Sequence, residues 1–393
     1  MATWPVDEAR LERVRALMEE DDLDALVVRA PDNVVYLTNY WCMKGYDLAV
    51  FPRRGPATLV VLAPQLEDAG RTAWTGDIRT YPHYDPADPR PPADRALSLA
   101  LGVLAERDLG RRVGVELSQT AQGADRMAGE PTVFSAPYFE AFGKVAREVA
   151  DATGLLARAR MRKTAQELER MRLAQELATL GLEHVGARIR PGMRESEVGA
   201  MFEGFVHETG IGYQGRVEMA RAFTLVWSGP GIKTFTATGH RPVCEHEPTL
   251  LEIWVCADGY WTDLTKNFCP GSLDSRYVDL LELLLQARDD AVAHLRPGAD
   301  LAEVDRAIRS RLAEGGYAGQ PDHAVAHGVG ARAHEPPWAH QASPATVEEG
   351  MVLAIEPGAY WPGGGGLRLE DDYLVTAGGA ERLGTFRDDF RAG

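Results

Sequence analysis

The stretch IRPGMRESEVGAMFEGFVHETGI, residues 189–211, has a second copy in the chain, LRPGADLAEVDRAIRSRLAEGGY, residues 295–317. The two copies align without gaps at an offset of 106 residues, and each contains a Pro-Gly turn, a helical segment and a glycine stop. Strand-like segments follow both copies. A shared helix-turn pattern could produce part of this match by chance. The interpretation we favour is a duplicated α+β half, with two halves facing each other around a cleft, a common place for a ligand site.

The part of the chain before the repeat has a different character, because helix-like and strand-like segments alternate there. This alternation predicts a small α/β domain. Helices are expected over residues 7–21 and 94–106, and strands over residues 23–28, 48–62 (two strands about an Arg-Gly-Pro turn) and 111–117. A Pro-rich surface loop is expected over residues 84–94.

A long helix is predicted to begin after Thr164. Thr164 and Glu167 have the spacing of a capping box, in which the two side chains satisfy backbone N–H groups that the first helical turn leaves open. A chain of 393 residues usually forms more than one hydrophobic core. We therefore place a domain boundary just before this helix, between residues 1–158 and residues 159–393.

Composition and charge exclude several classes of partner. The net charge of −16 comes without a basic block, so nucleic acid is not expected as a partner. No apolar run approaches the roughly 20 residues that span a bilayer, and the N-terminus has no apolar signal core, so neither a membrane nor export is expected. The four cysteines show no Cys-x-x-Cys pairing, which favours reduced thiols in a cytoplasmic protein.

The stretch LLEIWVCADGYWTDLTKNF, residues 250–268, places Glu252 and Asp263 in apolar and aromatic surroundings. Glu252 and Asp263 would lie on opposite faces of a single straight strand, because their separation is odd. Asp258-Gly259 is a strong hairpin signal, however, and a turn there pairs Trp254 with Asp263. Glu252 then lies diagonal to Asp263 on the same face. Two buried carboxylates side by side repel unless a proton or a cation lies between them.

Further candidate ligands follow in strand-like surroundings. Glu356 and Glu370 are evenly spaced about a Pro/Gly-rich loop, which predicts another hairpin with both acids on one face. Together with Glu252, Asp263 and the imidazole of His327, they suit a pair of divalent ions such as Mn, Co, Fe or Zn. Two such ions about 4 Å apart can share a water, lower its pKa and polarise a carbonyl group.

Each of these residues has a simpler explanation by itself. A glutamate before Pro-Gly, such as Glu356, is usually a turn residue, and an isolated histidine such as His327 is more often structural. Asp263 could pair with Lys266 on the surface. The ordered combination is much more specific than any one member. No Gly-x-Ser-x-Gly nucleophile turn is present.

Six segments resemble the M24 metallopeptidase family, which includes Xaa-Pro aminopeptidases, prolidases, methionine aminopeptidases and creatinase-like relatives. The matching segments are RVRALMEEDDLDALVVRAPDNVVYLTNYW, MRKTAQELERMRLA, GYWTDLTKNF, HGVGARAHEPP and the pair MVLAIEPGAY and GLRLEDDYLVT. The resemblance runs nearly from end to end. It implies an α+β pita-bread catalytic domain with duplicated halves, preceded by a smaller α/β creatinase-like domain.

The resemblance also implies roles for individual residues. Glu356 would act as a general base that moves the proton of the attacking water. His334 would contact the substrate and steady the tetrahedral intermediate, and Arg368 would orient Glu370. The implied metal ligands are Glu252, Asp263, His327, Glu356 and Glu370. The expected cofactor is a divalent metal, usually two ions, with one or none if the site is altered.

Two positions near the first ligand depart from the family pattern. The family has Asp where this chain has Glu252, and a small Gly where it has Trp254. By strand alternation Trp254 faces the same way as Glu252, so its indole would fill space beside the metals or displace one ion. The alternative is that Trp254 packs in the core through a local bulge.

A third departure is a missing histidine. The family's peptidases carry a substrate-contacting His a few residues after a Ser-Gly pair. Seven residues on from Gly229 the chain has Thr236, and counting back from Arg241 reaches Phe235. His240 is nearby and would replace the missing histidine if the loop is shifted.

The sequence leaves three hypotheses for function. The first is a metal-dependent hydrolase resembling Xaa-Pro aminopeptidase or prolidase, which cleaves the N-terminal residue from short peptides. The second is a non-peptidase on the same fold, either a creatinase-like or ectoine-hydrolase-like C–N hydrolase or a dimethylsulfoniopropionate-type lyase acting on a small molecule. The third is a binding protein that has lost its activity. The resemblance also implies a homodimer.

Overall fold

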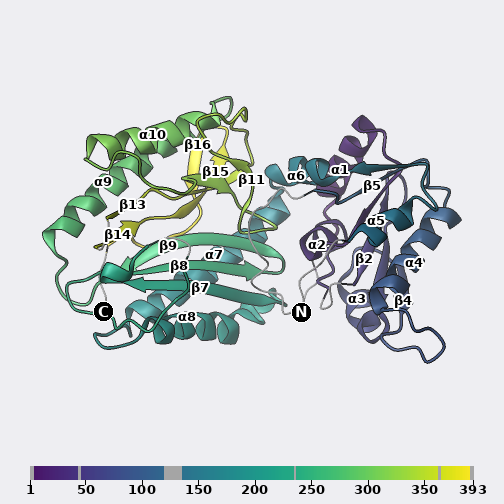
Figure 1. Ribbon diagram of the computed structural model, residues 1–393, viewed down its shortest axis with the longest axis horizontal. Coiled ribbons are helices and arrows are strands. Elements are labelled where there is room, and N and C mark those ends of the chain that lie inside the picture. Colours follow the sequence, from purple (N-terminus) through teal and green to yellow (C-terminus); the bar gives the residue numbers. More distant parts are fainter. Residues whose placement is uncertain (1–3, 43–45, 119–134, 234–235, 362–363, 390–393) are drawn as a thin grey trace. The chain divides into compact units, whose positions relative to one another are not determined.

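The computed structural model describes residues 4–42, 46–118, 135–233, 236–361 and 364–389 (Figure 1). By its internal contacts the chain divides into two compact units, residues 2–160 and 161–393. Within the described ranges, no helix combines the length and the apolar character that a membrane-spanning segment needs. All four cysteines are free thiols, as the sequence predicts.

The first unit is a three-layer α/β structure around a six-stranded sheet of order β4-β3-β2-β1-β5-β6. Helices α1, α2, α3 and α6 contribute to the apolar core on one face of the sheet, and α4 and α5 contribute to the core on the other. The strands are β1 (Ala25–Val28), β2 (Leu48–Pro52), β3 (Thr58–Leu62), β4 (Asp77–Tyr81), β5 (Arg112–Val115) and β6 (Glu148–Asp151). The helices are α1 (Glu8–Glu20), α2 (Pro31–Thr38), α3 (Leu66–Thr72), α4 (Pro92–Glu106), α5 (Ala136–Phe142) and α6 (Thr153–Met161).

The predicted elements of this unit are present. The segment around the Arg-Gly-Pro turn forms the antiparallel pair β2–β3. The Pro-rich loop ends earlier than predicted, because Pro92 begins α4, where a proline without an N–H group is well tolerated.

The second unit consists of two α+β halves. The first half contains α7 (Ala165–Gly186), α8 (Glu195–Gly210), β7 (Ala220–Ser228), β8 (Thr249–Ala257) and β9 (Tyr260–Phe268). The second contains α9 (Ser275–Val292), α10 (Leu301–Glu314), β10 (Ala326–Gly328), β11 (Glu335–Trp338), β12 (Val352–Ile355), β13 (Gly358–Trp361), β14 (Gly365–Arg368), β15 (Asp371–Thr376) and β16 (Gly379–Arg382). Their strands form the sheets β7-β8-β9, β11-β10-β12-β15-β16 and β13-β14. The predicted capping box of Thr164 and Glu167 starts α7.

The two copies of the sequence repeat make the same backbone contacts. Gly192 and Gly298 both have φ +88°, a left-handed conformation that glycine adopts without strain. The Gly192 N–H donates to the Val243 carbonyl at 2.8 Å, and the Gly298 N–H donates to the Val347 carbonyl at 2.9 Å. The two halves therefore repeat one another in backbone geometry as well as in sequence.

The hairpin predicted at Asp258-Gly259 is confirmed. Both residues have positive φ, +47° and +84°, as a tight two-residue hairpin turn requires. Trp254 pairs with Asp263, and the register is continuous from one end of β8 to the other. The alternative of a local bulge at Trp254 is therefore wrong, and Glu252 and Trp254 share one face of the sheet.

The second predicted hairpin brings Glu356 and Glu370 together. Ile355 pairs with Asp371 between β12 and β15, and Gly358 pairs with Arg368 between β13 and β14, so both pairs keep one register. Glu356 and Glu370 occupy equivalent positions on the two arms, where the chain passes from one sheet to the next. Residues 362 and 363 of the intervening loop lie outside the described residues.

Candidate metal centre

Asp263, His327 and Glu370 form the buried floor of an acidic cluster in the second unit, with 1%, 1% and 2% of their surface exposed. His327 lies at its centre. The His327 Nε2 atom lies 3.4 Å from an oxygen of Glu356, 3.7 Å from one of Glu370 and 3.8 Å from one of Asp263. Strands β9 and β10 and the junctions beside β12 and β15 therefore converge on one imidazole nitrogen.

Two buried polar atoms of this floor have no hydrogen-bond partner, His327 Nε2 and Asp263 Oδ1. The His327 Nδ1 lies 3.0 Å from the Gly328 carbonyl and donates to it, so the neutral imidazole, the form that binds a cation, has its lone pair on Nε2, facing the carboxylates. An imidazole lone pair surrounded by carboxylate oxygens is a donor set for a divalent cation. The residues therefore fit the metal that the sequence predicts. Two overlapping groups have suitable geometry, Asp263–His327–His334 and His327–Glu356–Glu370.

Burial and repulsion between neighbouring carboxylates shift the pKa values of these groups. Burial raises the pKa of Asp263 well above its usual value, and the charges of Glu370 and Glu252 raise it further. Burial and the charge of Glu370 raise the pKa of Glu356 in the same way. Burial alone would lower the pKa of His327, but Glu370 and Glu356 raise it to about 9. Such a cluster is electrostatically unfavourable without protons or a cation among the carboxylates.

Arg368 joins the two edges of the cluster. Its guanidinium forms an ion pair with Glu252, and its Nε donates to Thr265 Oγ1 at 3.0 Å. Thr265 in turn donates to Glu370 at 2.7 Å. Arg368 was expected to orient Glu370; in the structure it reaches Glu370 through Thr265, and its direct partner is Glu252.

Trp254 contacts the floor directly. Its indole Nε1 donates a hydrogen bond of 2.7 Å to Asp263 Oδ2. The ring is buried and stacks on Phe223, with ring centroids 5.4 Å apart. Trp254 therefore lies beside the candidate ligands, as strand alternation predicts.

The exposed fractions of the side chains show which side of the cluster is open to solvent. The side chains of Glu356 and Glu252 are 12% and 15% exposed, and that of His334 is 35% exposed. The His334 Nε2 lies 3.5 Å from Asp263 Oδ2, and its ring stacks on Trp338. His334 is thus the part of this cluster that solvent or a substrate reaches most easily.

The segment in which the resemblance expects a substrate-contacting histidine follows β7 in the chain. The Thr236 carbonyl accepts the indole hydrogen of Trp227, and its hydroxyl is buried without a hydrogen-bond partner. His240 is exposed, and the contacts of the described residues do not join it to the carboxylates. Its proposed role stays a prediction, and Phe235 lies outside the described residues.

Sequence reasoning missed His323. Its Nδ1 lies 3.3 Å from an oxygen of Glu356 and its Nε2 lies 3.1 Å from the Tyr360 hydroxyl. Burial, with the nearby charge of Arg368, lowers the pKa of His323 to about 4, so it is neutral near pH 7. Its position four residues before His327 was the only signal in the sequence.

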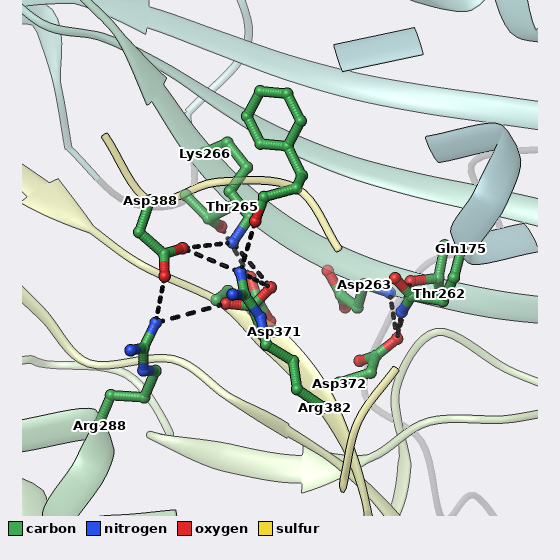
Figure 2. A network of polar contacts seen from close by, with 12 residues as sticks. Gln175, Thr262, Asp263, Thr265, Lys266, Arg288, Asp371, Asp372, Arg382 and Asp388 are labelled. Atoms are coloured by element: carbon green, nitrogen blue, oxygen red, sulfur yellow. Dashed lines mark hydrogen bonds and ion pairs between the residues drawn. The ribbon is translucent and has the colours of Figure 1, made fainter. Parts of the chain in front are cut away.

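Asp372 accepts a hydrogen bond from the backbone of Asp263 and so helps to fix its position (Figure 2). One of its oxygens accepts hydrogen bonds from the Gln175 amide at 2.7 Å, the Thr262 hydroxyl at 2.7 Å and the Asp263 backbone N–H at 3.2 Å. Glu370 and Asp372 point to the cluster side of β15, and the residue between them points away. Of the three consecutive acids, Glu370 and Asp372 therefore belong to the candidate metal cluster and its supports, and Asp371 belongs to a separate ion network.

Asp371 belongs to a buried ion network on the other side of β15 (Figure 2). It contacts Lys266 at 2.7 Å and Arg382 at 2.8 Å, and Arg288 lies 3.8 Å away. Asp388 contacts the same three cations. The alternative in which Lys266 pairs with Asp263 on the surface is therefore wrong.

Asp371→Asn is expected to lower the free energy of unfolding by about 3–5 kcal/mol, because it leaves the buried Lys266 and the partly buried Arg288 and Arg382 to share Asp388 as their remaining buried or partly buried carboxylate. Urea denaturation in the presence of a chelator measures this. The matched control is Asp289→Asn, since Asp289 also contacts Arg288, at 3.2 Å, but its side chain is 71% exposed. The control is expected to cost less than about 1 kcal/mol. Equal losses in the two variants would contradict the prediction.

Comparison with known proteins places this cluster in a family. The sequence pattern of metallopeptidase family M24 matches residues 169–377, and that of the creatinase/prolidase N-terminal domain matches residues 10–162. The chain belongs to metallopeptidase family M24. It is a hydrolytic enzyme of the aminopeptidase/dipeptidase type.

Individual relatives agree with this assignment. An Xaa-Pro dipeptidase of Pyrococcus furiosus is 31% identical over 235 residues, which are 57% of this chain and 63% of that protein. A protein of Bacillus subtilis named as a candidate dipeptidase is 27% identical over 97% of this chain and 98% of its own. The solved prolidase of Pyrococcus horikoshii has a TM-score of 0.79 at 22% identity, covering 97% of this chain and 99% of that one. The predicted pita-bread domain and creatinase-like N-terminal domain are confirmed.

Proposed function

We propose that this enzyme is a metal-dependent dipeptidase or aminopeptidase that releases the N-terminal residue of a short peptide. The observation that carries the proposal is the convergence of three carboxylates on the His327 Nε2 atom, which has no hydrogen-bond partner. The residues that would hold the cation are His327, Glu356 and Glu370, with Asp263 beside them. Names of relatives that act on Xaa-Pro dipeptides support a short-peptide substrate.

A bound divalent cation would supply a Lewis acid that polarises the scissile carbonyl and lowers the pKa of the attacking water. Glu356 is the carboxylate best placed to take the proton of that water. It contacts the central imidazole with one oxygen and His323 with the other, and it is more exposed than Glu370. Taking the proton and returning it to the departing amine is the work of a general base and acid.

His334 and the aromatic residues around it would hold the substrate. Its imidazole is the most exposed member of the cluster and can donate a hydrogen bond to an oxyanion that forms on the scissile carbonyl. The rings of Trp254 and Trp338 lie beside His334, and the partly exposed Trp338 and Phe223 offer apolar surface to a side chain or a proline ring. A homodimer and a cytoplasmic location stay predictions of the sequence.

A second candidate function is a C–N hydrolase or lyase reaction on a non-peptide small molecule. Thr236 stands where the family's peptidases have a substrate-contacting histidine, and its hydroxyl is buried. The indole of Trp254 lies against Asp263 in the space beside the cluster. Both features make the part of the site that would contact the substrate less like that of a peptidase. They leave His327, Glu356 and Glu370, which would hold the cation, unchanged.

Assay of the purified chain against a panel of Xaa-Pro dipeptides, other dipeptides and longer peptides distinguishes the two candidates. Amine release from the peptides, lost on chelation and restored by Mn, Co, Fe or Zn, is the expected result. Release from dipeptides alone would define a dipeptidase, and release from longer peptides an aminopeptidase. Absence of turnover across the panel with cation bound would reject the peptidase and leave the second candidate.

A further inference from the structure

The two groups of possible ligands share one histidine. The groups Asp263–His327–His334 and His327–Glu356–Glu370 both need the imidazole of His327. Its Nδ1 donates to the Gly328 carbonyl, so only Nε2 has a lone pair to offer, and one lone pair binds one cation. The two groups are therefore alternative positions for a single ion. They are not two sites with separate ligands.

A second cation would need Asp263 and its neighbours as ligands. Trp254 hinders cation binding at Asp263. The Trp254 indole hydrogen points at Asp263 Oδ2, the same oxygen that lies 3.5 Å from His334. An indole N–H donates and cannot ligate, so it occupies a lone pair of that oxygen and adds a positive hydrogen where a cation would bind. The ring is buried and held by Phe223, which keeps it in place.

Glu252 already has a cationic partner and is not available to a second metal ion. It belongs to neither group of possible ligands, and its carboxylate forms an ion pair with the buried guanidinium of Arg368. Arg368 is also held by Thr265 and the Tyr360 hydroxyl, so it is a fixed cation at this edge of the cluster. A buried guanidinium keeps its charge at any ordinary pH. Arg368 therefore compensates the charge of Glu252, which a second metal would otherwise do.

We infer that the cluster holds a single divalent cation, on His327, Glu356 and Glu370, and that Trp254 with the Glu252–Arg368 pair excludes a second. The inference rests on the proposed cation and goes beyond the proposed function in assigning the number of ions and the residue that limits it. Trp254 acts here through Asp263 and is a positioning residue.

Titration of the metal-free full chain with Mn²⁺ tests this inference. Isothermal calorimetry and elemental analysis after gel filtration are expected to give one ion per wild-type chain, with the electron paramagnetic resonance spectrum of an isolated ion. Trp254→Gly is expected to raise the stoichiometry toward two and to produce the spectrum of an exchange-coupled pair. Trp74→Gly is the control, because Trp74 is a packed tryptophan of the first unit whose indole also donates to a backbone carbonyl. It is expected to stay at one ion.

Each outcome decides the inference. Two ions on the wild-type chain would overturn it, whether or not the variants fold. A folded Trp254→Gly that still binds one ion would overturn the role of Trp254. One ion on a wild-type chain that cleaves no peptide supports the inference while the proposed function fails. Two ions on a chain that does cleave peptides keep the proposed function and reject the inference.

Discussion

Replacement of Glu356 by glutamine is expected to lower kcat for peptide cleavage by about 10³-fold at saturating cation, within the range that general acid–base catalysis contributes. Glutamine keeps the shape of the side chain and one oxygen that can contact His327, but it cannot accept a proton. The contacts of Glu356 with His327 and His323 place it at the open side of the cluster, where the attacking water must lie. Steady-state kinetics over a range of cation concentrations separates the loss of the base from any loss of cation affinity.

The control for this prediction is Glu349→Gln, because Glu349 is an exposed glutamate of the preceding turn. Its kcat is expected to stay within a factor of two of the wild-type value. A Glu356→Gln enzyme that keeps more than a tenth of wild-type kcat would show that another group takes the proton. His323 would then be the next residue to replace, since it lies 3.3 Å from Glu356.

The parts of the fold that the sequence predicted follow from short-range rules. The capping box at Thr164, the Asp258-Gly259 turn and the Pro-Gly turns of the repeat all depend on residues within a few positions of one another. Once the turn at Asp258 is correct, the register of the hairpin places Trp254 opposite Asp263, and strand alternation puts Glu252 and Trp254 on one face. The pattern of acids along two hairpins was therefore enough to pair Glu252 with Asp263 on one hairpin and Glu356 with Glu370 on the other, but not to join the two hairpins to each other or to His327.

The partners within the cluster could not be predicted in the same way. Arg368 forms its ion pair with Glu252 and not with Glu370. Asp372 accepts a hydrogen bond from Gln175, which lies nearly two hundred residues away in the sequence. Such choices depend on side-chain direction and on which strands of the two halves lie side by side. Sequence alternation assigns a face to each residue but not a partner. For the same reason the direction of the Trp254 indole, and hence its hydrogen bond to Asp263, appears only in the structure.

Replacement of His327 by alanine is expected to lower the affinity for Mn²⁺ by at least about 100-fold, since loss of a residue that merely supports a ligand already costs 10–100-fold. His327 is the one residue that both groups of possible ligands contain. Removing it leaves His323 beside Glu356, but His323 belongs to neither group of possible ligands and its Nδ1 lies 2.6 Å from the Ala324 carbonyl. Carboxylates alone hold transition metals less selectively. Calorimetric titration of the metal-free chain measures the change directly.

Thermal stability gives an independent measure of the same prediction. A cation that binds only the folded chain stabilises it by about 2.7 kcal/mol at a concentration of 100 times its Kd. The wild-type Tm should therefore rise when Mn²⁺ is added, whereas at that concentration a 100-fold weaker site stabilises His327→Ala by only about 0.4 kcal/mol, so its Tm should rise far less. His340→Ala is the control, because His340 is an exposed histidine that caps a turn through the Ala342 N–H. It should respond like the wild type. A His327→Ala chain that is stabilised by Mn²⁺ as strongly as this control would show that cation binding does not depend on His327, the residue that both groups of possible ligands share.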